Sequence, residues 1–74
     1  METLLFKTNI PAPDISILNK LVAALENIDG IVQWKLDIDS IYKLLIIKGR
    51  ALNPIHIIKE LQHRGIDAIR LFEE

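Results

Sequence analysis

With 74 residues, 50% of them hydrophobic and 26% charged, the chain can bury one small core and is too apolar to remain disordered. The absence of cysteine excludes disulfides, thiolate nucleophiles and sulfur-ligated zinc or copper, and a net charge of −1 without charge runs disfavours nucleic-acid and anionic-membrane partners. No apolar run approaches the roughly 20 residues of a membrane span, so we expect one domain over residues 1–74, without a leader, in the cytoplasm.

The first half of the chain predicts a strand, a helix and a second strand. Segment 3–10 is β-branched and apolar and ends at two prolines, which indicates a strand. Apolar residues at helical spacing then predict an amphipathic helix over 17–28, with Asp14 or Ser16 as its N-cap. After a glycine that can close this helix, segment 31–38 alternates with period two and indicates a strand.

The second half predicts a strand, a helix and a strand. A hairpin turn at 37–40 leads into a strand over 42–49. A helix follows, with Asn53 as its cap, a proline at its first position and Gly65 at its end. Segment 66–72 is the last strand, so the element order is βαββαβ.

The two halves also resemble each other. With one residue inserted before the first glycine, the apolar positions of 21–36 coincide with those of 57–71. A repeated βαβ unit is typical of the ferredoxin-like fold, an α+β sandwich in which two helices cover one face of a four-stranded antiparallel sheet. The alignment predicts that four side chains point at the helices: Trp34, Leu36, Ile69 and Leu71.

The opposite face of the sheet is predicted to be unusually apolar for a surface that is open to water. We expect it to carry Leu5, Lys7, Gln33, Lys35, Leu44, Ile46, Arg70 and Phe72. A contiguous apolar patch bordered by charge is typical of an interaction surface, either for a second copy of the chain or for another protein. A homodimer through this face would add burial that so small a chain lacks.

One family resembles this pattern. The βαββαβ order, the segment KTNI at 7–10 and the segment WKLDID at 34–39 are similar to heavy-metal-associated domains of copper chaperones and P-type metal pumps. The resemblance implies a metal loop after the first strand, where a Cys-x-x-Cys pair holds a soft ion beside a helix N-terminus. Threading the segments places the two cysteine positions at Ala12 and Ile15, which have no donor atoms. The chain resembles a degenerate member that has lost its metal ligands.

The loop over 11–15 has two interpretations. Its two prolines restrict the backbone, which makes it stiffer than a loop that must open to release an ion. With Ile15 packed inward, the loop would be a structural connector. The alternative is a former metal loop that has become a contact surface.

A competing hypothesis keeps the metal role with ligands other than cysteine. His56, His63, Asp14 and the Met1 sulfur and amine are the available donors. The two histidines lie seven positions apart, about 10.5 Å along a helix, whereas two-histidine sites on helices use positions i and i+4. We expect both imidazoles to be solvated and bound metal to be absent.

Catalysis and nucleic-acid binding find little support. No nucleophile beside a base, no paired carboxylates and no Gly-rich phosphate loop can be assembled, so we predict a non-enzymatic domain without a cofactor. RNA-recognition domains share the element order, but segment 42–49 lacks their aromatic and glycine pattern. Small-molecule-sensing regulatory domains often have a glycine in the loop after the first strand, and 9–15 has none.

Overall fold

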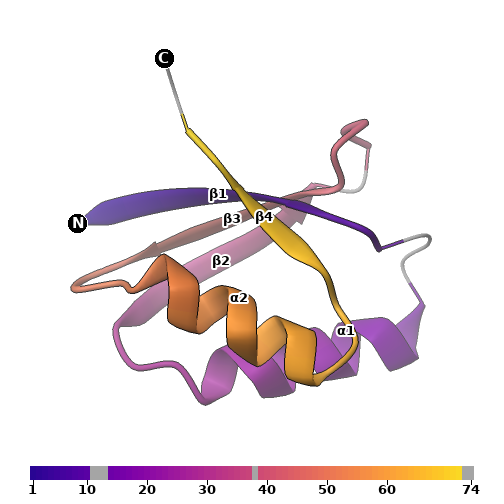
Figure 1. Ribbon diagram of the computed structural model, residues 1–74, viewed down its shortest axis with the longest axis horizontal. Coiled ribbons are helices and arrows are strands. Elements are labelled where there is room, and N and C mark those ends of the chain that lie inside the picture. The colour runs from indigo at the N-terminus through magenta and orange to yellow at the C-terminus, as the bar shows by residue number, and fades with distance from the viewer. Residues whose placement is uncertain (11–13, 38, 73–74) are drawn as a thin grey trace.

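The structure of the chain is a computed structural model that describes residues 1–10, 14–37 and 39–72. Its elements are β1 (Glu2–Thr8), α1 (Ile15–Glu26), β2 (Ile31–Asp37), β3 (Leu44–Gly49), α2 (Pro54–His63) and β4 (Ala68–Leu71). The strands form one antiparallel sheet in the order β2-β3-β1-β4. Both helices lie on the same face of it (Figure 1), which is the predicted ferredoxin-like arrangement.

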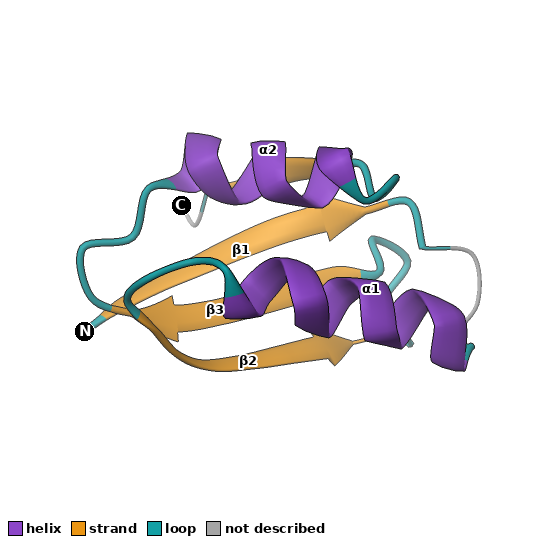
Figure 2. Cartoon of the chain, turned by 90° about the horizontal axis from the view of Figure 1, so that it is seen from below, coloured by secondary structure: helices purple, strands orange, loops and turns teal. Residues whose placement is uncertain are grey.

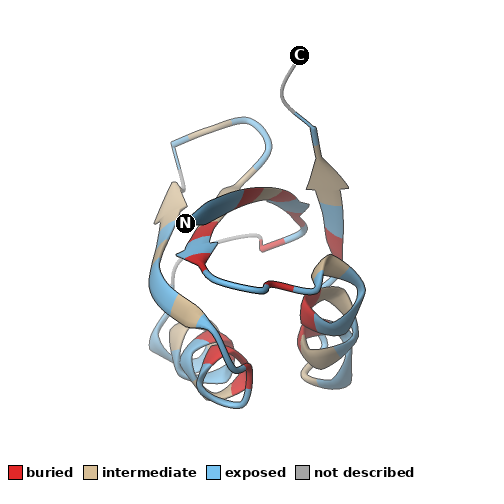
Figure 3. Cartoon of the chain, turned by 90° about the vertical axis from the view of Figure 1, so that its left-hand side faces the viewer, coloured by how far each residue is buried: buried red, intermediate tan, exposed pale blue. Residues whose placement is uncertain are grey.

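Each helix covers a different part of the sheet. In Figure 2, α1 lies along the β2 and β3 side, whereas α2 lies along the β1 and β4 side. Figure 3 shows the two helices side by side beneath the sheet, with neither helix on the opposite face. Neither helix in the described part of the chain has the length and apolarity needed to span a bilayer.

Side-chain caps fix where both helices begin. Of the two predicted caps of α1, Asp14 performs the role, because its Oδ1 accepts a hydrogen bond of 2.8 Å from the Ile17 N–H. At α2 the Asn53 Oδ1 accepts hydrogen bonds from the N–H groups of Ile55 and His56, at 3.1 and 3.3 Å. Each helix therefore begins next to a residue whose side chain accepts hydrogen bonds from otherwise unpaired amide groups.

The end of α2 is a Schellman motif. Gly65 has φ +80°, its N–H donates to the Gln62 carbonyl, and the Ile66 N–H donates to the Leu61 carbonyl at 2.9 Å. Ile66 is buried against the core, which is the hydrophobic contact that accompanies this motif. The direction in which the chain enters β4 is thereby fixed.

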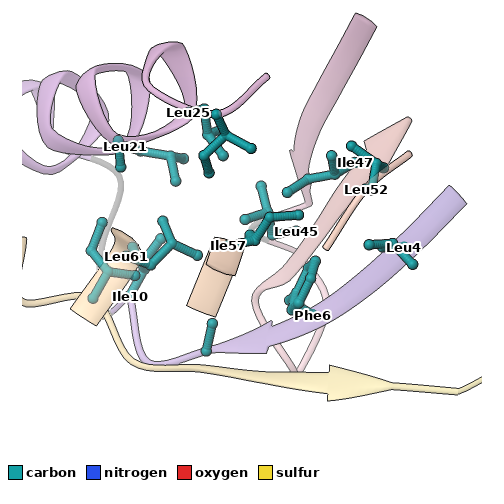
Figure 4. Close-up of a cluster of buried hydrophobic side chains, with 14 residues drawn as sticks. Leu4, Phe6, Ile10, Leu21, Leu25, Leu45, Ile47, Leu52, Ile57 and Leu61 are labelled. Atoms are coloured by element: carbon teal, nitrogen blue, oxygen red, sulfur yellow. The ribbon is translucent and has the colours of Figure 1, made fainter. Parts of the chain in front are cut away.

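The core lies between the sheet and the two helices (Figure 4). Half-buried Trp34 and Leu36 of β2 pack against it, so their predicted inward orientation is confirmed. Fourteen buried hydrophobic side chains of the described residues form it: Leu4, Phe6, Ile10, Leu21, Ala24, Leu25, Ile28, Leu45, Ile47, Leu52, Ile57, Leu61, Ile66 and Ala68.

The predicted orientation of β4 is wrong. Arg70 pairs with buried Phe6, and Ile69 pairs with exposed Lys7. Directly opposed residues of an antiparallel pair share a face, so Arg70 lies on the helix side and Ile69 on the uncovered side. By alternation, Leu71 shares the uncovered side with Ile69.

Phe72 is also misplaced in the prediction. It follows the last residue of β4, and its ring lies 4.4 Å from the guanidinium carbon of Arg70. The two side chains therefore pair with each other and lie apart from the uncovered face.

A β-bulge in β2 is the physical reason for this error. Ile31 pairs with Gly49 and Gln33 with Lys48, the residue before Gly49, which leaves Val32 as an extra residue. Ile31 and Trp34 both pack against the core, although an odd spacing of three would place them on opposite faces of a regular strand.

In the second half, by contrast, the buried residues Ile66 and Ala68 are two positions apart, as in a regular strand. The repeat alignment assumed that inward and outward residues follow one another in β4 as they do in the bulged β2. It therefore assigned every residue of β4 to the wrong face.

The turn between β2 and β3 shortens the predicted third strand, which begins at 44 instead of 42. Lys43 has φ +47°, outside the range of a strand, and its carbonyl accepts a 2.7 Å hydrogen bond from the Thr8 hydroxyl. Position 38 of the predicted second strand lies outside the described residues.

Candidate functional site

The sheet face opposite the helices is the first candidate surface, and we call it the open face. A row of directly paired residues crosses it from β2 to β4. Three members of this row are adjacent and apolar, so the apolar surface is contiguous across β3, β1 and β4. The row consists of Lys35, Ile46, Leu5 and Leu71.

Further apolar and charged side chains extend this row. Leu44 lies two positions from Ile46 on β3, and Ile69, at 63% exposure, lies two positions from Leu71 on β4. Among the described residues, lysines outnumber carboxylates on this face by three to one. The charged side chains of the open face are Lys7, Lys35, Lys48 and Asp37.

The open face also has a cation–π contact and a hollow. The Lys7 ammonium lies 5.8 Å from the centroid of the Tyr42 ring, a cation–π distance at the end of β1. A shallow hollow of about 110 Å³ lies across β2 and β3. Its lining residues are Gln33, Trp34, Lys35, Ile46 and Lys48.

Most of the predicted interaction residues lie on this face, but not all. The structure brings together Leu5, Lys7, Lys35, Leu44 and Ile46. Arg70 and Phe72 lie elsewhere, and the prediction missed the residues that replace them, Ile69 and Leu71. The open face is consequently more apolar at β4 than the sequence analysis expected.

One sequence signal would have given the right phase for β4. Gly65 followed by Ile66 is the pattern of a Schellman motif, whose residue after the glycine packs back on the helix. With Ile66 inward, alternation turns Ala68 and Arg70 inward and Ile69 outward, as observed.

The other candidate is the end of the molecule where the resemblance places a metal loop. Ala12 lies outside the described residues. Ile15 is the first residue of α1 and is 77% exposed, so the expectation that it packs inward is wrong. It lies two residues, or about 200° around the helix, from Ile17, which packs against the core.

Nearby polar groups are already engaged or carry positive charge. Asp14 caps α1. The Asn9 side chain donates to the Asp67 carboxylate at 3.3 Å and accepts from the Asp67 backbone N–H at 3.0 Å. Lys20 and Arg64 border a hollow of about 190 Å³, and these two cations oppose the entry of a metal cation. Its lining among the described residues consists of Asn9, Ile10, Ile17, Lys20, Arg64, Gly65 and Ile66.

The remaining candidate ligands are dispersed. His56 and His63 are both exposed on α2, as predicted, and Met1 is exposed at the start of the chain. Within residues 1–10, 14–37 and 39–72, no group of three or more His, Cys, Asp or Glu side chains is arranged to hold a metal ion.

No protein-family model matches the sequence, and no curated protein matches it. Solved structures match the fold. The copper-binding domain of the P-type ATPase HMA7 has a TM-score of 0.78 at 18% identity, over 100% of this chain and 99% of that chain.

Two further structures agree with it. The N-terminal domain of PacS from Synechocystis PCC6803 has a TM-score of 0.77 at 10% identity, over 97% of this chain and 100% of that chain. A chain in the complex of Atx1, Cu(I) and yeast Ccc2a has a TM-score of 0.77 at 9% identity, over 100% of both chains. The chain thus has the ferredoxin-like fold of heavy-metal-associated domains and lacks the cysteine pair that the resemblance places at positions 12 and 15.

Proposed function

We propose that the chain is a cytoplasmic, non-enzymatic domain that binds another protein through its open face. The observation that supports this function best is the apolar row of Ile46, Leu5 and Leu71, which Leu44 and Ile69 extend. Contiguous apolar surface bordered by charge is the usual composition of a protein interface.

The charges of the open face favour a particular kind of partner. In the part of the chain that the structure describes, Lys7, Lys35 and Lys48 outnumber the carboxylate of Asp37 on this face. A second copy docked face to face would oppose two surfaces of net positive charge, which is unfavourable. The partner is therefore a different protein whose apolar patch is bordered by Asp or Glu side chains.

The fold supports a binding role in a second way. A domain with this fold takes part in the Atx1–Cu(I)–Ccc2a complex, in which the metal ion is present. This chain has no cysteine to share such an ion, so the affinity of its complex would come from apolar burial and charge pairing alone.

A matched pair of surface substitutions tests the proposal. Ile69 on the open face and Ile55 on α2 are 63% and 65% exposed, so aspartate at either position should leave the domain folded. We expect the immobilised wild-type chain to retain a partner from its own cells. Ile69→Asp should lose that partner, Ile55→Asp should keep it, and raised salt should weaken retention. Quantitative mass spectrometry of the retained proteins is the measurement, with circular dichroism to verify folding.

Identical sets of retained proteins on the two variants would contradict the proposal. The double variant Leu44→Asp, Ile46→Asp provides a second disruption of the same face. Sedimentation equilibrium identifies the occupant: a wild-type dimer that Ile69→Asp dissociates would mean that the open face binds a second copy instead.

A further inference from the structure

The outer edge of β2 is a second surface suited to binding. The strand order places β2 at one edge of the sheet, and the strand has seven residues, against four for β4 at the opposite edge. Its bulge is confined to Ile31–Gln33, and the pairing with β3 is regular from Gln33 to Asp37. Among the described residues, no strand pairs with its outer side. Such an edge presents a row of backbone donors and acceptors.

A groove of about 300 Å³, lined mostly by apolar residues, runs beside this edge, between β2 and α1. Figure 2 shows α1 alongside β2, and Figure 3 shows the same helix beneath that edge of the sheet. Val32, the extra residue of the bulge, is 63% exposed and borders the groove. The groove is lined by Val22, Leu25, Glu26, Ile28, Ile31, Val32 and Trp34.

We propose that this groove and the free edge of β2 together bind an extended peptide segment of a partner protein, which adds to the sheet as a fifth strand. The main chain of the peptide would pair with β2, and every second side chain would enter the groove. Six of the seven lining residues are apolar and the seventh is Glu26. The peptide therefore has apolar residues at alternate positions and a Lys or Arg that meets Glu26.

A second copy of the chain fits this surface less well. The inward side chains of its own β2, Trp34 and Leu36, are packed against its own core, so they are not free to fill the groove. An extended segment without a core of its own has free side chains at alternate positions. The proposal does not depend on the open face, whose apolar row of Ile46, Leu5 and Leu71 shares no residue with the groove.

The probe is a displayed library of random twelve-residue peptides without tryptophan, selected against the folded wild-type chain. We expect enriched peptides with alternating apolar residues and at least one basic residue. Trp34, the single tryptophan of the chain, borders the groove, so its emission should change as a synthesised peptide binds. Amide shifts in NMR spectra should be confined to β2 and α1.

Four aspartate variants, two in the groove and two controls, identify the surface that is bound. Val32→Asp and Val22→Asp, on opposite walls of the groove, should each weaken peptide binding at least tenfold. Ile69→Asp and Ile55→Asp, whose exposures match that of Val32, should leave it unchanged. These controls matter because Trp34 also borders the hollow on the open face.

Three results would overturn the proposal. The first is a selection that enriches no peptide above the level found with Val32→Asp. The second is unchanged affinity in both groove variants. The third is a wild-type dimer that Val32→Asp dissociates, since a second copy would then be the occupant of the edge. Loss of peptide binding in Ile69→Asp alone would mean that the peptides bind the open face instead of the groove. Each of the two proposals can therefore be contradicted independently of the other.

Discussion

At the scale of single residues, two glycines with the same backbone handedness have different surroundings. Gly30 and Gly65 have φ of +94° and +80°. A Cβ at Gly30 would collide with the Arg50 carbonyl oxygen, whereas a Cβ at Gly65 meets nothing within 4 Å. We expect Gly65→Ala to lower the free energy of unfolding by about 1 kcal/mol and Gly30→Ala by about 3 kcal/mol, because the second adds a backbone clash to the strain. Urea denaturation measures both, and equal losses would mean that the chain around Arg50 relaxes freely.

The sequence predicted that both glycines follow a helix, but it could not separate them. The collision at Gly30 comes from a carbonyl 20 positions further along the chain, held close by the hydrogen bond from the Arg50 N–H to the Gly30 carbonyl. Local patterns report backbone conformation. They do not report which distant segment comes into contact.

At the scale of elements, helix starts were predictable because they depend on local chemistry. Asp14 and Ser16 were both acceptable caps in the sequence, and the structure assigns the role to Asp14. We expect Asp14→Ala to lower the free energy of unfolding by about 1 kcal/mol, whereas Ser16→Ala changes it by less than about 0.5 kcal/mol. Thermal unfolding by circular dichroism compares the two, and a larger loss in Ser16→Ala would contradict the assignment.

The faces of β4 were not predictable in the same way. The bulge in β2 is defined by the pairing of β2 with β3, and the composition of residues 31–33 does not indicate it. A period-two pattern gives the faces of a strand only relative to its own first residue. Which residues of β4 point at the helices is determined by the packing of Ile66 on the core. In the sequence, only the Schellman pattern could have indicated this contact.

At the scale of the whole molecule, fold and chemistry are separable. The same arrangement of helices and strands occurs in a copper-binding domain of a P-type ATPase, while this chain has no cysteine. The element order predicted the arrangement. The candidate surfaces depended on strand register and on the groove beside α1, which element order does not determine.

This separation gives a gain-of-function prediction. We expect the wild-type chain not to compete with a chromophoric Cu(I) chelator, whereas Ala12→Cys, Ile15→Cys should bind one Cu(I), because it supplies two thiolates three positions apart in the sequence. Position 15 is exposed at the helix N-terminus, where the helix dipole favours a thiolate. Competition by the wild-type chain at equal strength would favour the alternative ligands His56, His63, Asp14 or Met1.

The pairing of β1 with β4 has a mechanical consequence. The strands are antiparallel neighbours, with Leu5 opposite Leu71, so the start of β1 and the end of β4 point to the same end of the sheet. A pulling force on the two ends would act across this pair and open its hydrogen bonds one after another, rather than shearing them all at once. Under tension, the domain should therefore give way first at β4, the shortest strand, while β2 and β3 remain joined.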